Sequence, residues 1–226
     1  MDWYNDERLA GEVRSMTPVQ RRKAAILALR RLQQPLTGLA MPQEWGVDSQ
    51  VLKAVLRAGE SALKNAYDGS LHAAVEEILR APIFADEEDD LYAEGNQELQ
   101  LEVLAAWINL CEVWEEMREG ATKSLLMKVR QLTIGEDAGV QQSLSVISGE
   151  AERQAYLDGV DRTLAEYGLG YFGTRNIEIE RRCNDVILGS SDDMELWASR
   201  DGREVQQLCD EFSSEILSVL QDSSSF

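Results

Sequence analysis

The sequence predicts an all-α fold, an irregular or up-and-down bundle of about seven to nine helices with a central apolar helix. Apolar residues recur at three- and four-residue spacing along most of the chain, which is the period of a helix that buries one face. Only 4 prolines occur in 226 residues, so long helices are seldom interrupted. Neither a convincing strand pattern nor an internal repeat is found.

Clear start signals mark the first helix that the sequence predicts. Thr17 fits an N-cap, Pro18 the first helical position and Gln20 the capping-box position. We expect this helix to end near Gln34, ahead of Pro35. It also carries a basic cluster, which could bind a phosphate or dock on an acidic helix of this chain or of a second copy: Arg21, Arg22, Lys23, Arg30 and Arg31.

Three further helices are expected in the middle of the chain. Asp48 is the expected cap of a helix over residues 49–66, and Ser70 is the expected cap of a shorter helix that ends before Pro82. The segment over about residues 89–118 is apolar nearly all round. We therefore predict that it forms the helix at the centre of the bundle.

The rest of the chain continues the helical pattern. Thr122 is the expected cap of the next helix, residues 135–150 predict a loop or a weak helix, and another helix follows. Three glycines within residues 168–174 then mark the best internal boundary. We predict a helical bundle core over residues 1–170 and a C-terminal helical extension over residues 171–226, packed on or beside the core.

The three cysteines are scattered and form no CxxC pair, which argues against a disulfide framework. Cys111, Cys183 and Cys209 each lie among apolar residues of a helical pattern, so we expect small buried side chains. The N-terminus has no apolar signal segment, and no stretch of about 18 apolar residues occurs. These features predict a cytoplasmic protein without a membrane partner.

The net charge of −19 is spread unevenly along the chain. Residues 81–120 hold 12 acidic residues against 1 basic residue, and residues 171–226 hold 12 against 5. Direct binding of nucleic acid is not expected, because the neutralisation of phosphates requires a basic face. A concentrated negative field instead favours a basic protein partner and speeds the encounter with it.

The strongest acidic run, residues 86–90, stands just before the most apolar segment. It does not fit a calcium loop, because the sixth and twelfth positions counted from Asp86 are Leu91 and Gln97 rather than Gly and Glu. An acidic helix N-terminus beside the helix dipole is one interpretation, and a metal site is another. For a binding role we favour a face for a basic partner, made by Asp86, Glu87, Glu88, Asp89, Asp90 and Glu94.

A second acidic set could serve an enzyme. It recurs at three- and four-residue spacing and would therefore line one helix face: Glu112, Glu115, Glu116 and Glu119. All-α, magnesium-dependent nucleotide pyrophosphatases use two such ExxE steps with a further acidic pair, and Asp158 and Asp161 could be that pair. About forty residues separate the two groups here, more than is usual in that family, and a solvated helix face explains the same spacing.

The order of segments resembles that of the YjaG-like family of small helical bacterial proteins of unknown function, over roughly residues 17–167. The resemblance lies in an arginine-bearing first helix, "VDSQVLKAVLRAGESAL", a short helix ending in "LRAP", the acidic run and the long "LEVLAAWINLCEVW" helix. Related helical, acidic proteins occur among immunity proteins of bacterial toxin systems, so the resemblance implies such a role at most. It supplies no catalytic residue.

These patterns favour a non-enzymatic acidic module that binds a basic protein, namely an immunity protein that neutralises a basic toxin. No GxSxG, HExxH, P-loop or GxGxxG motif is present, and His72 is the only histidine. The alternative is a magnesium-dependent all-α nucleotide hydrolase, and magnesium is the only cofactor that any of the patterns implies. A homo-oligomer is compatible with the sequence.

Overall fold

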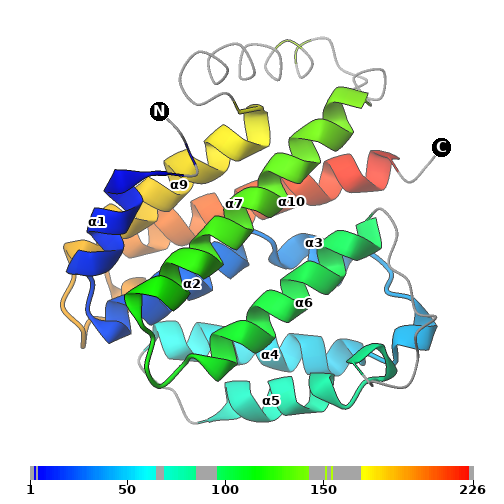
Figure 1. Cartoon of the computed structure of the whole chain (residues 1–226), viewed down its shortest axis with the longest axis horizontal. Coiled ribbons are helices and arrows are strands. Elements are labelled where there is room, and N and C mark those ends of the chain that lie inside the picture. Colours follow the sequence, from blue (N-terminus) through cyan, green and yellow to red (C-terminus); the bar gives the residue numbers. More distant parts are fainter. Residues whose placement is uncertain are drawn as a thin grey trace.

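Nine α-helices and three short 3-10 helices lie in the part of the chain that the structure, a computed structural model, describes (Figure 1). The described residues are 3, 5–64, 69–84, 96–142, 151, 154 and 169–223. None of them lies in a strand, so the all-α prediction is confirmed for these residues. The helices are α1 (Glu7–Ser15), α2 (Pro18–Arg30), α3 (Gln33–Gly38), η1 (Gln43–Trp45), α4 (Ser49–Leu63), α5 (Ser70–Leu79), η2 (Pro82–Phe84), α6 (Asn96–Glu112), α7 (Glu119–Gln142), α9 (Tyr171–Leu188), η3 (Leu196–Ala198) and α10 (Arg200–Ser223).

Side-chain caps start the first two helices. The Asp6 carboxylate accepts hydrogen bonds from the backbone N–H groups of Arg8 (3.0 Å) and Leu9 (3.2 Å), and so caps α1, a helix that the sequence patterns did not reveal. Thr17 and Gln20 form the predicted capping box. The Gln20 N–H donates to Thr17 Oγ1 at 3.2 Å, and the Thr17 N–H donates to Gln20 Oε1 at 3.0 Å.

Two helix boundaries in the first half of the chain differ from the predicted ones. Helix α2 ends at Arg30 rather than near Gln34. Pro35 lies in the first turn of α3, where its missing N–H removes no intrahelical hydrogen bond. Gly69, with a φ of 81°, is the N-cap of α5 in place of Ser70, because a glycine adopts this left-handed conformation without strain.

Helix α7 also begins and ends elsewhere than predicted. It starts at Glu119, so Thr122 is not its cap but lies within it, with the hydroxyl donating to the Arg118 carbonyl at 3.1 Å. The helix continues to Gln142, so the first half of the segment 135–150 is helical. The polar, glycine-containing composition of that half hid the helix, which contacts α9 and α2.

The centre of the bundle is α2 rather than α6. Residues 23–29 of α2 are all buried without interruption, and α2 contacts α4, α6, α7, α9 and α10. Helix α6 buries much of its circumference but keeps an exposed side, where Glu98, Asn109 and Glu112 face solvent. The prediction that the segment over residues 89–118 forms the central helix is therefore wrong.

One apolar cluster holds the described helices together. It joins residues as distant in sequence as Leu9 of α1, Trp107 of α6 and Phe212 of α10, so the two last helices share the core of the earlier ones. A small second cluster forms around Leu169 and Ile177. Helices α4 and α5 lie together at the lower edge of Figure 1, beneath α6. Among the described residues, no helix combines the length and the apolar character that a membrane span requires.

Candidate functional site

The predicted partner-binding face lies outside the described residues. This holds for all six of its members: Asp86, Glu87, Glu88, Asp89, Asp90 and Glu94. The described chain resumes at Asn96, and the exposed side of α6 then continues the acidic character with Glu98 and Glu102. Glu102 pairs with Lys128 of α7, with 2.6 Å between Oε2 and Nζ. Carboxylates thus follow the acidic run directly along α6.

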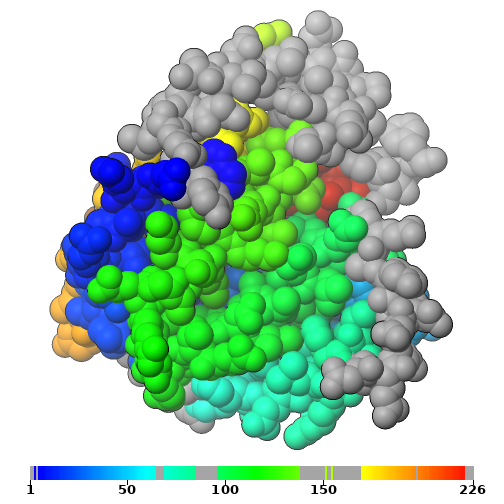
Figure 2. All heavy atoms as spheres, viewed as in Figure 1, coloured from blue at the N-terminus to red at the C-terminus, as the bar shows by residue number. Residues whose placement is uncertain are grey.

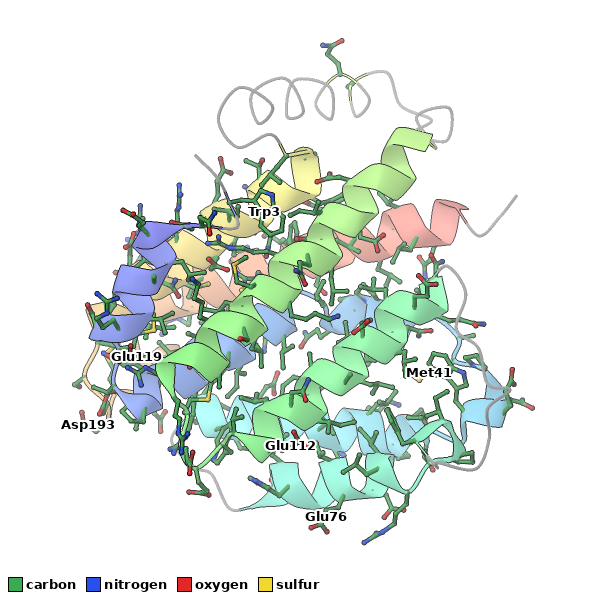
Figure 3. The ribbon with its side chains drawn as sticks, in the orientation of Figure 1. Trp3, Met41, Glu76, Glu112, Glu119 and Asp193 are labelled. Atoms are coloured by element: carbon green, nitrogen blue, oxygen red, sulfur yellow. The ribbon has the colours of Figure 1, made fainter. Side chains whose placement is uncertain are left out.

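The four glutamates of the enzyme alternative do not share one helix face. Helix α6 ends at Glu112, the chain turns through residues 113–118, and α7 begins only at Glu119 (Figure 3). In that turn Met117 has a φ of 33°, an uncommon conformation for a side chain of this size. The prediction of a common face is wrong because a helix break separates these residues.

Two glutamates of that set pair with different arginines. Glu119 Oε1 lies 3.2 Å from Nη2 of Arg21, and Glu116 Oε2 lies 2.6 Å from Nη2 of Arg118. Asp158 and Asp161 lie outside the described residues. Within the described part of the chain, no group of three or more His, Cys, Asp or Glu side chains is placed to hold a metal ion.

A shallow groove of about 380 Å³ separates α6 from α7 on the face shown in Figure 2. Glu102 and Lys128 form an ion pair across it, and Glu112 lies at its edge. Small side chains make up much of its wall: Ala105, Ala106, Asn109, Ala121 and Ser124. Besides that ion pair, its polar lining residues are Asn109, Glu112 and Ser124.

The basic cluster of α2 is used inside the fold. Arg22 donates from Nε to the Trp114 carbonyl at 2.8 Å and stacks its guanidinium 5.3 Å from the centre of that indole ring. Arg21 donates to the carbonyls of Val13 (3.0 Å) and Met117 (3.3 Å). Both cations therefore satisfy carbonyl groups near helix ends, where the helix dipole also favours positive charge.

Lys23 and Arg30 bind other parts of the chain. The buried Lys23 ammonium donates to the carbonyls of Asp192 (3.0 Å) and Met194 (2.7 Å), and burial lowers its pKa. Arg30 donates from Nε and Nη2 to the two carboxylate oxygens of Asp210, both at 2.7 Å, and from Nη1 to Glu60 at 3.1 Å. Docking on an acidic helix of the same chain, one of the predicted alternatives, is thus confirmed for Arg30, which binds α10, whereas Lys23 binds backbone carbonyls of the turn before η3.

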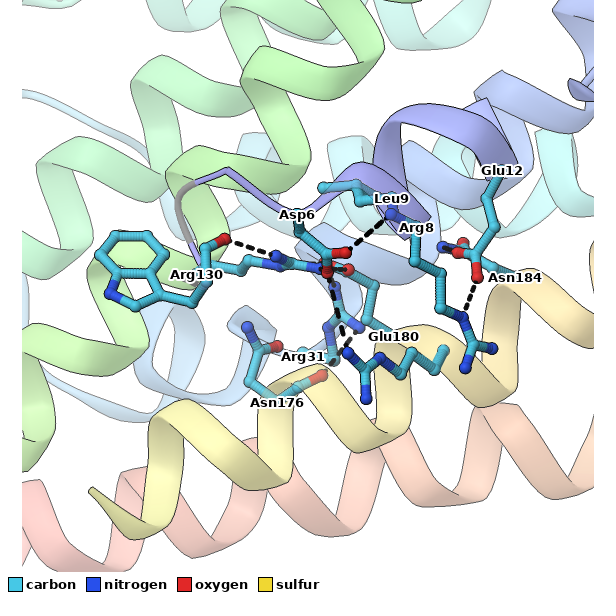
Figure 4. A network of polar contacts seen from close by, with 11 residues as sticks. Asp6, Arg8, Leu9, Glu12, Arg31, Arg130, Asn176, Glu180 and Asn184 are labelled. Carbon is cyan, nitrogen blue, oxygen red and sulfur yellow. Dashed lines mark hydrogen bonds and ion pairs between the residues drawn. The ribbon is translucent and has the colours of Figure 1, made fainter. Parts of the chain in front are cut away.

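A buried ionic network is the most elaborate polar feature of the described residues (Figure 4). Arg130 of α7 forms ion pairs with both Glu180 of α9 and Asp6, and donates from Nη1 to the Trp3 carbonyl at 2.9 Å. The side chains of Arg130, Glu180 and Asp6 are 1–3% exposed. Burial acts to raise the pKa of Asp6, but the Leu9 N–H and Arg130 outweigh it and lower that pKa.

Arg31 borders this network with little hydrogen bonding of its own. Its side chain is 1% exposed, and Nη2 lies 3.8 Å from Glu180 Oε2. Nη1 reaches the Asn176 carbonyl at 3.5 Å, whereas Nε and Nη2 have no hydrogen-bond partner among the described residues. The charge of Arg31 is therefore compensated only in part, and it acts on groups nearby.

Asp137 of α7 caps α9 across the interface between the two helices. Its carboxylate accepts the backbone N–H groups of Phe172 and Gly173, each at 2.8 Å. Gly170 makes this possible, because a Cβ at that position would clash with the Asp137 carboxylate. Burial raises the pKa of Asp137 to about 6, and burial together with the Asp137 charge raises the pKa of Glu136 to about 7.

These two carboxyl groups predict a pH dependence of stability. Their pKa values in the folded state lie above the ordinary ones, so the folded protein binds more protons than the unfolded chain. The contribution of these two groups to the free energy of unfolding is therefore fully present below about pH 4 and decreases as the pH rises through 6 and 7. We expect the free energy of unfolding to rise by roughly 4 kcal/mol between pH 8 and pH 5, measured by urea denaturation.

The Glu136→Gln variant is the control for this prediction. It removes one of the two titrating groups, so the change between pH 8 and pH 5 should become clearly smaller than in the wild type. Equal pH profiles for the two proteins would contradict the assignment.

Sequence patterns alone did not reveal the buried network or the Asp137 cap. Asp6, Arg130 and Glu180 come from segments far apart in the chain, so no spacing connects them. One signal was present: Arg130 and Glu180 occupy positions in the apolar stripes of their helices.

Comparison of the chain with protein-family models, with curated proteins and with solved structures gives no match. The resemblance to the YjaG-like family stays a prediction.

Proposed function

We propose that this protein is a non-enzymatic acidic module that binds a basic protein partner. The observation that carries the proposal is the sign of the surface charge. Among the described residues, 18 Asp and Glu are exposed against 10 Lys and Arg. The residues outside the described part add 13 acidic and 2 basic ones to the chain. Such an excess favours cationic partners and accelerates their approach.

Half of the described basic residues are used inside the fold. Ten of the 20 described Lys and Arg residues are buried or half-buried, among them Arg21, Lys23, Arg30 and Arg130. These four residues bind carbonyls and carboxylates of the same chain, and the carboxylates that pair with Arg21 and Arg30 are themselves partly exposed. Nine of the described Asp and Glu residues are buried or half-buried as well, so burial leaves the acidic excess of the described residues nearly unchanged.

The acidic run over residues 86–94 is the face that we assign to the partner. It holds six carboxylates and no basic residue, and Glu98 of α6 extends it. A protein that binds nucleic acid through a basic surface has the complementary charge, because phosphate groups and carboxylates attract the same cations. A nuclease-like toxin neutralised by an immunity protein is the biological pairing that fits this chemistry, and the resemblance to the YjaG-like family points the same way.

Charge reversal in the acidic run tests the proposal. We expect Glu87→Lys/Glu88→Lys/Asp89→Lys to lower the association rate with the partner at least about tenfold at low ionic strength, because the local field changes sign. The partner is first captured from the native host on immobilised wild-type protein and identified by mass spectrometry. Association rates are then measured by surface plasmon resonance at low and high salt.

The matched control reverses three exposed carboxylates elsewhere. Asp193→Lys/Glu195→Lys/Glu204→Lys changes the net charge by the same amount, far from the acidic run in sequence. This control should lose only the part of the rate that depends on net charge. If both variants bound the partner equally well, or if the captured partner were itself acidic, the proposal would be wrong.

A further inference from the structure

Two of the three cysteines face each other in the core. Cys183 of α9 and Cys209 of α10 have their Sγ atoms 3.8 Å apart, and their exposed fractions are 2% and 0%. The third cysteine, Cys111 of α6, is buried as well but makes no contact with another thiol. A separation of 3.8 Å is van der Waals contact, and a disulfide requires about 2.05 Å, so a modest approach of the two side chains would connect them.

The surroundings of this pair differ from an ordinary apolar core. The charge of Arg31, which has two guanidinium nitrogens without a hydrogen-bond partner among the described residues, acts on both sulfur atoms. A hydrogen bond from the Cys209 thiol lowers the pKa of Cys183, and Arg31 lowers it further, although burial acts in the opposite direction. Burial and the neighbouring Cys183 raise the pKa of Cys209. Arg31 therefore favours a thiolate in this pair, and the second thiol can donate a hydrogen bond to it.

We propose that Cys183 and Cys209 form an oxidation site at which a peroxide converts the two thiols to a disulfide that links α9 to α10. The site does not depend on the proposed binding function. A peroxide is the oxidant that fits, because both sulfurs are buried and hydrogen peroxide is little larger than water. A bulky disulfide reagent such as oxidised glutathione would have to open the core first.

The reaction takes place in two steps. The Cys183 thiolate attacks one peroxide oxygen, the O–O bond breaks, and the other oxygen leaves as hydroxide, which is protonated to water; Cys183 becomes a sulfenic acid. The Cys209 sulfur then attacks the Cys183 sulfur, the S–O bond breaks, and a second water leaves with the Cys209 proton. Each sulfur loses one electron and each peroxide oxygen gains one. Arg31 is a positioning residue that stabilises the thiolate.

Thiol counting on the full chain tests the proposal. The protein is reduced, desalted, treated with a small molar excess of hydrogen peroxide, quenched with catalase, and alkylated in denaturant. We expect the intact mass before alkylation to fall by about 2 Da and the number of alkylated thiols to fall from three to one. Peptide mapping should find Cys183 joined to Cys209, with Cys111 alkylated. Oxidised glutathione at the same concentration should leave all three thiols free.

Cys111 offers a matched control, since burial and Glu112 raise its pKa to about 12 and hold it in the unreactive thiol form. Cys111→Ala should go from two thiols to none, whereas Cys183→Ala should keep both of its thiols. Three free thiols in the peroxide-treated wild type would overturn the proposal, as would a mass increase of about 32 Da from sulfinic acid or a disulfide between two chains. The wild-type map decides the outcome even where a variant does not fold.

Discussion

Replacement of Arg130 by Met is expected to lower the free energy of unfolding by about 3–5 kcal/mol. The methionine fills much of the arginine volume, but the Glu180 and Asp6 carboxylates, 1% and 3% exposed, lose the cation between them. The cations that remain are more distant, with Arg31 3.8 Å from Glu180 and Arg181 3.9 Å from Asp6. Two buried carboxylates that lose their hydrogen-bonded cation are far more costly than the pair was favourable, which is why removal of one partner has a large effect. Urea denaturation at pH 7 measures the loss.

The loss of stability in Arg130→Met should also depend on pH, which tests the role of the lost cation by a second measurement. In the wild type, Arg130 helps to lower the pKa of Asp6, so the stability due to Asp6 is present above the unfolded pKa and is lost as the pH falls. In the variant that carboxyl group can be protonated at less cost, because Arg130 no longer favours its charged form. The difference in stability between the two proteins should therefore narrow as the pH falls from 7 toward 4.

Arg80 provides the control for a cation at the surface. Its side chain is 68% exposed and pairs with Glu76 and Glu77 on α5. Arg80→Met should change the free energy of unfolding by less than about 0.5 kcal/mol, because exposed ion pairs contribute little. A loss below about 1 kcal/mol for Arg130→Met would show that water enters the network and that the carboxylates are not desolvated as the structure indicates.

The network also fixes the start of the chain. Arg130 binds the Trp3 carbonyl and the Asp6 carboxylate, and Asp6 caps α1. One residue of α7 therefore connects the N-terminal segment to α9 through Glu180. In Arg130→Met we expect hydrogen exchange to accelerate, relative to the wild type, more for the amides of α1 than for those of the other helices. The anchor of α1 is lost while most apolar contacts remain.

Sequence periodicity was sufficient for the fold class because it reports which face of a helix is buried. Periodicity did not show which helix is the most deeply buried. Helix α2 has basic side chains that normally indicate solvent, but Lys23 and Arg22 end on carbonyls of residues 92 or more positions away. Contacts between residues so far apart in sequence do not affect the local spacing of apolar residues. Helix α6 is more apolar in sequence and yet lies with one side exposed.

Contacts between distant segments also limit what could be predicted of the sites. The acidic run is a matter of composition, so the charge that we assign to the partner face was evident from the sequence. The pairing of Cys183 with Cys209 depends on how α9 lies against α10, and nothing in their 26-residue separation predicts it. The helix break after Glu112 has no proline to signal it, and it separates carboxylates that spacing had placed together.

Trp107→Ala is expected to lower the free energy of unfolding by about 3–5 kcal/mol, because it removes a side chain only 2% exposed from the contact between α6 and α4. The indole lies directly on the backbone of α4 at Gly59. A Cβ at this glycine would lie 2.8 Å from Cη2 of the ring, closer than ordinary contact allows. Urea denaturation of the purified variant measures the loss.

A second substitution tests whether that close approach is what requires a glycine in α4. In the wild type, Gly59→Ala should destabilise, since the ring must move although alanine favours the helix by about 1 kcal/mol. In the Trp107→Ala background the obstacle is gone, so Gly59→Ala should stabilise by up to about 1 kcal/mol, a reversal of sign. At Gly11 of α1 a methyl group would meet no atom within 4 Å, so Gly11→Ala should stabilise both backgrounds alike. If Gly59→Ala stabilised the wild type as much as Gly11→Ala does, the indole would not be in contact with the helix backbone, and the large loss expected for Trp107→Ala would need another cause.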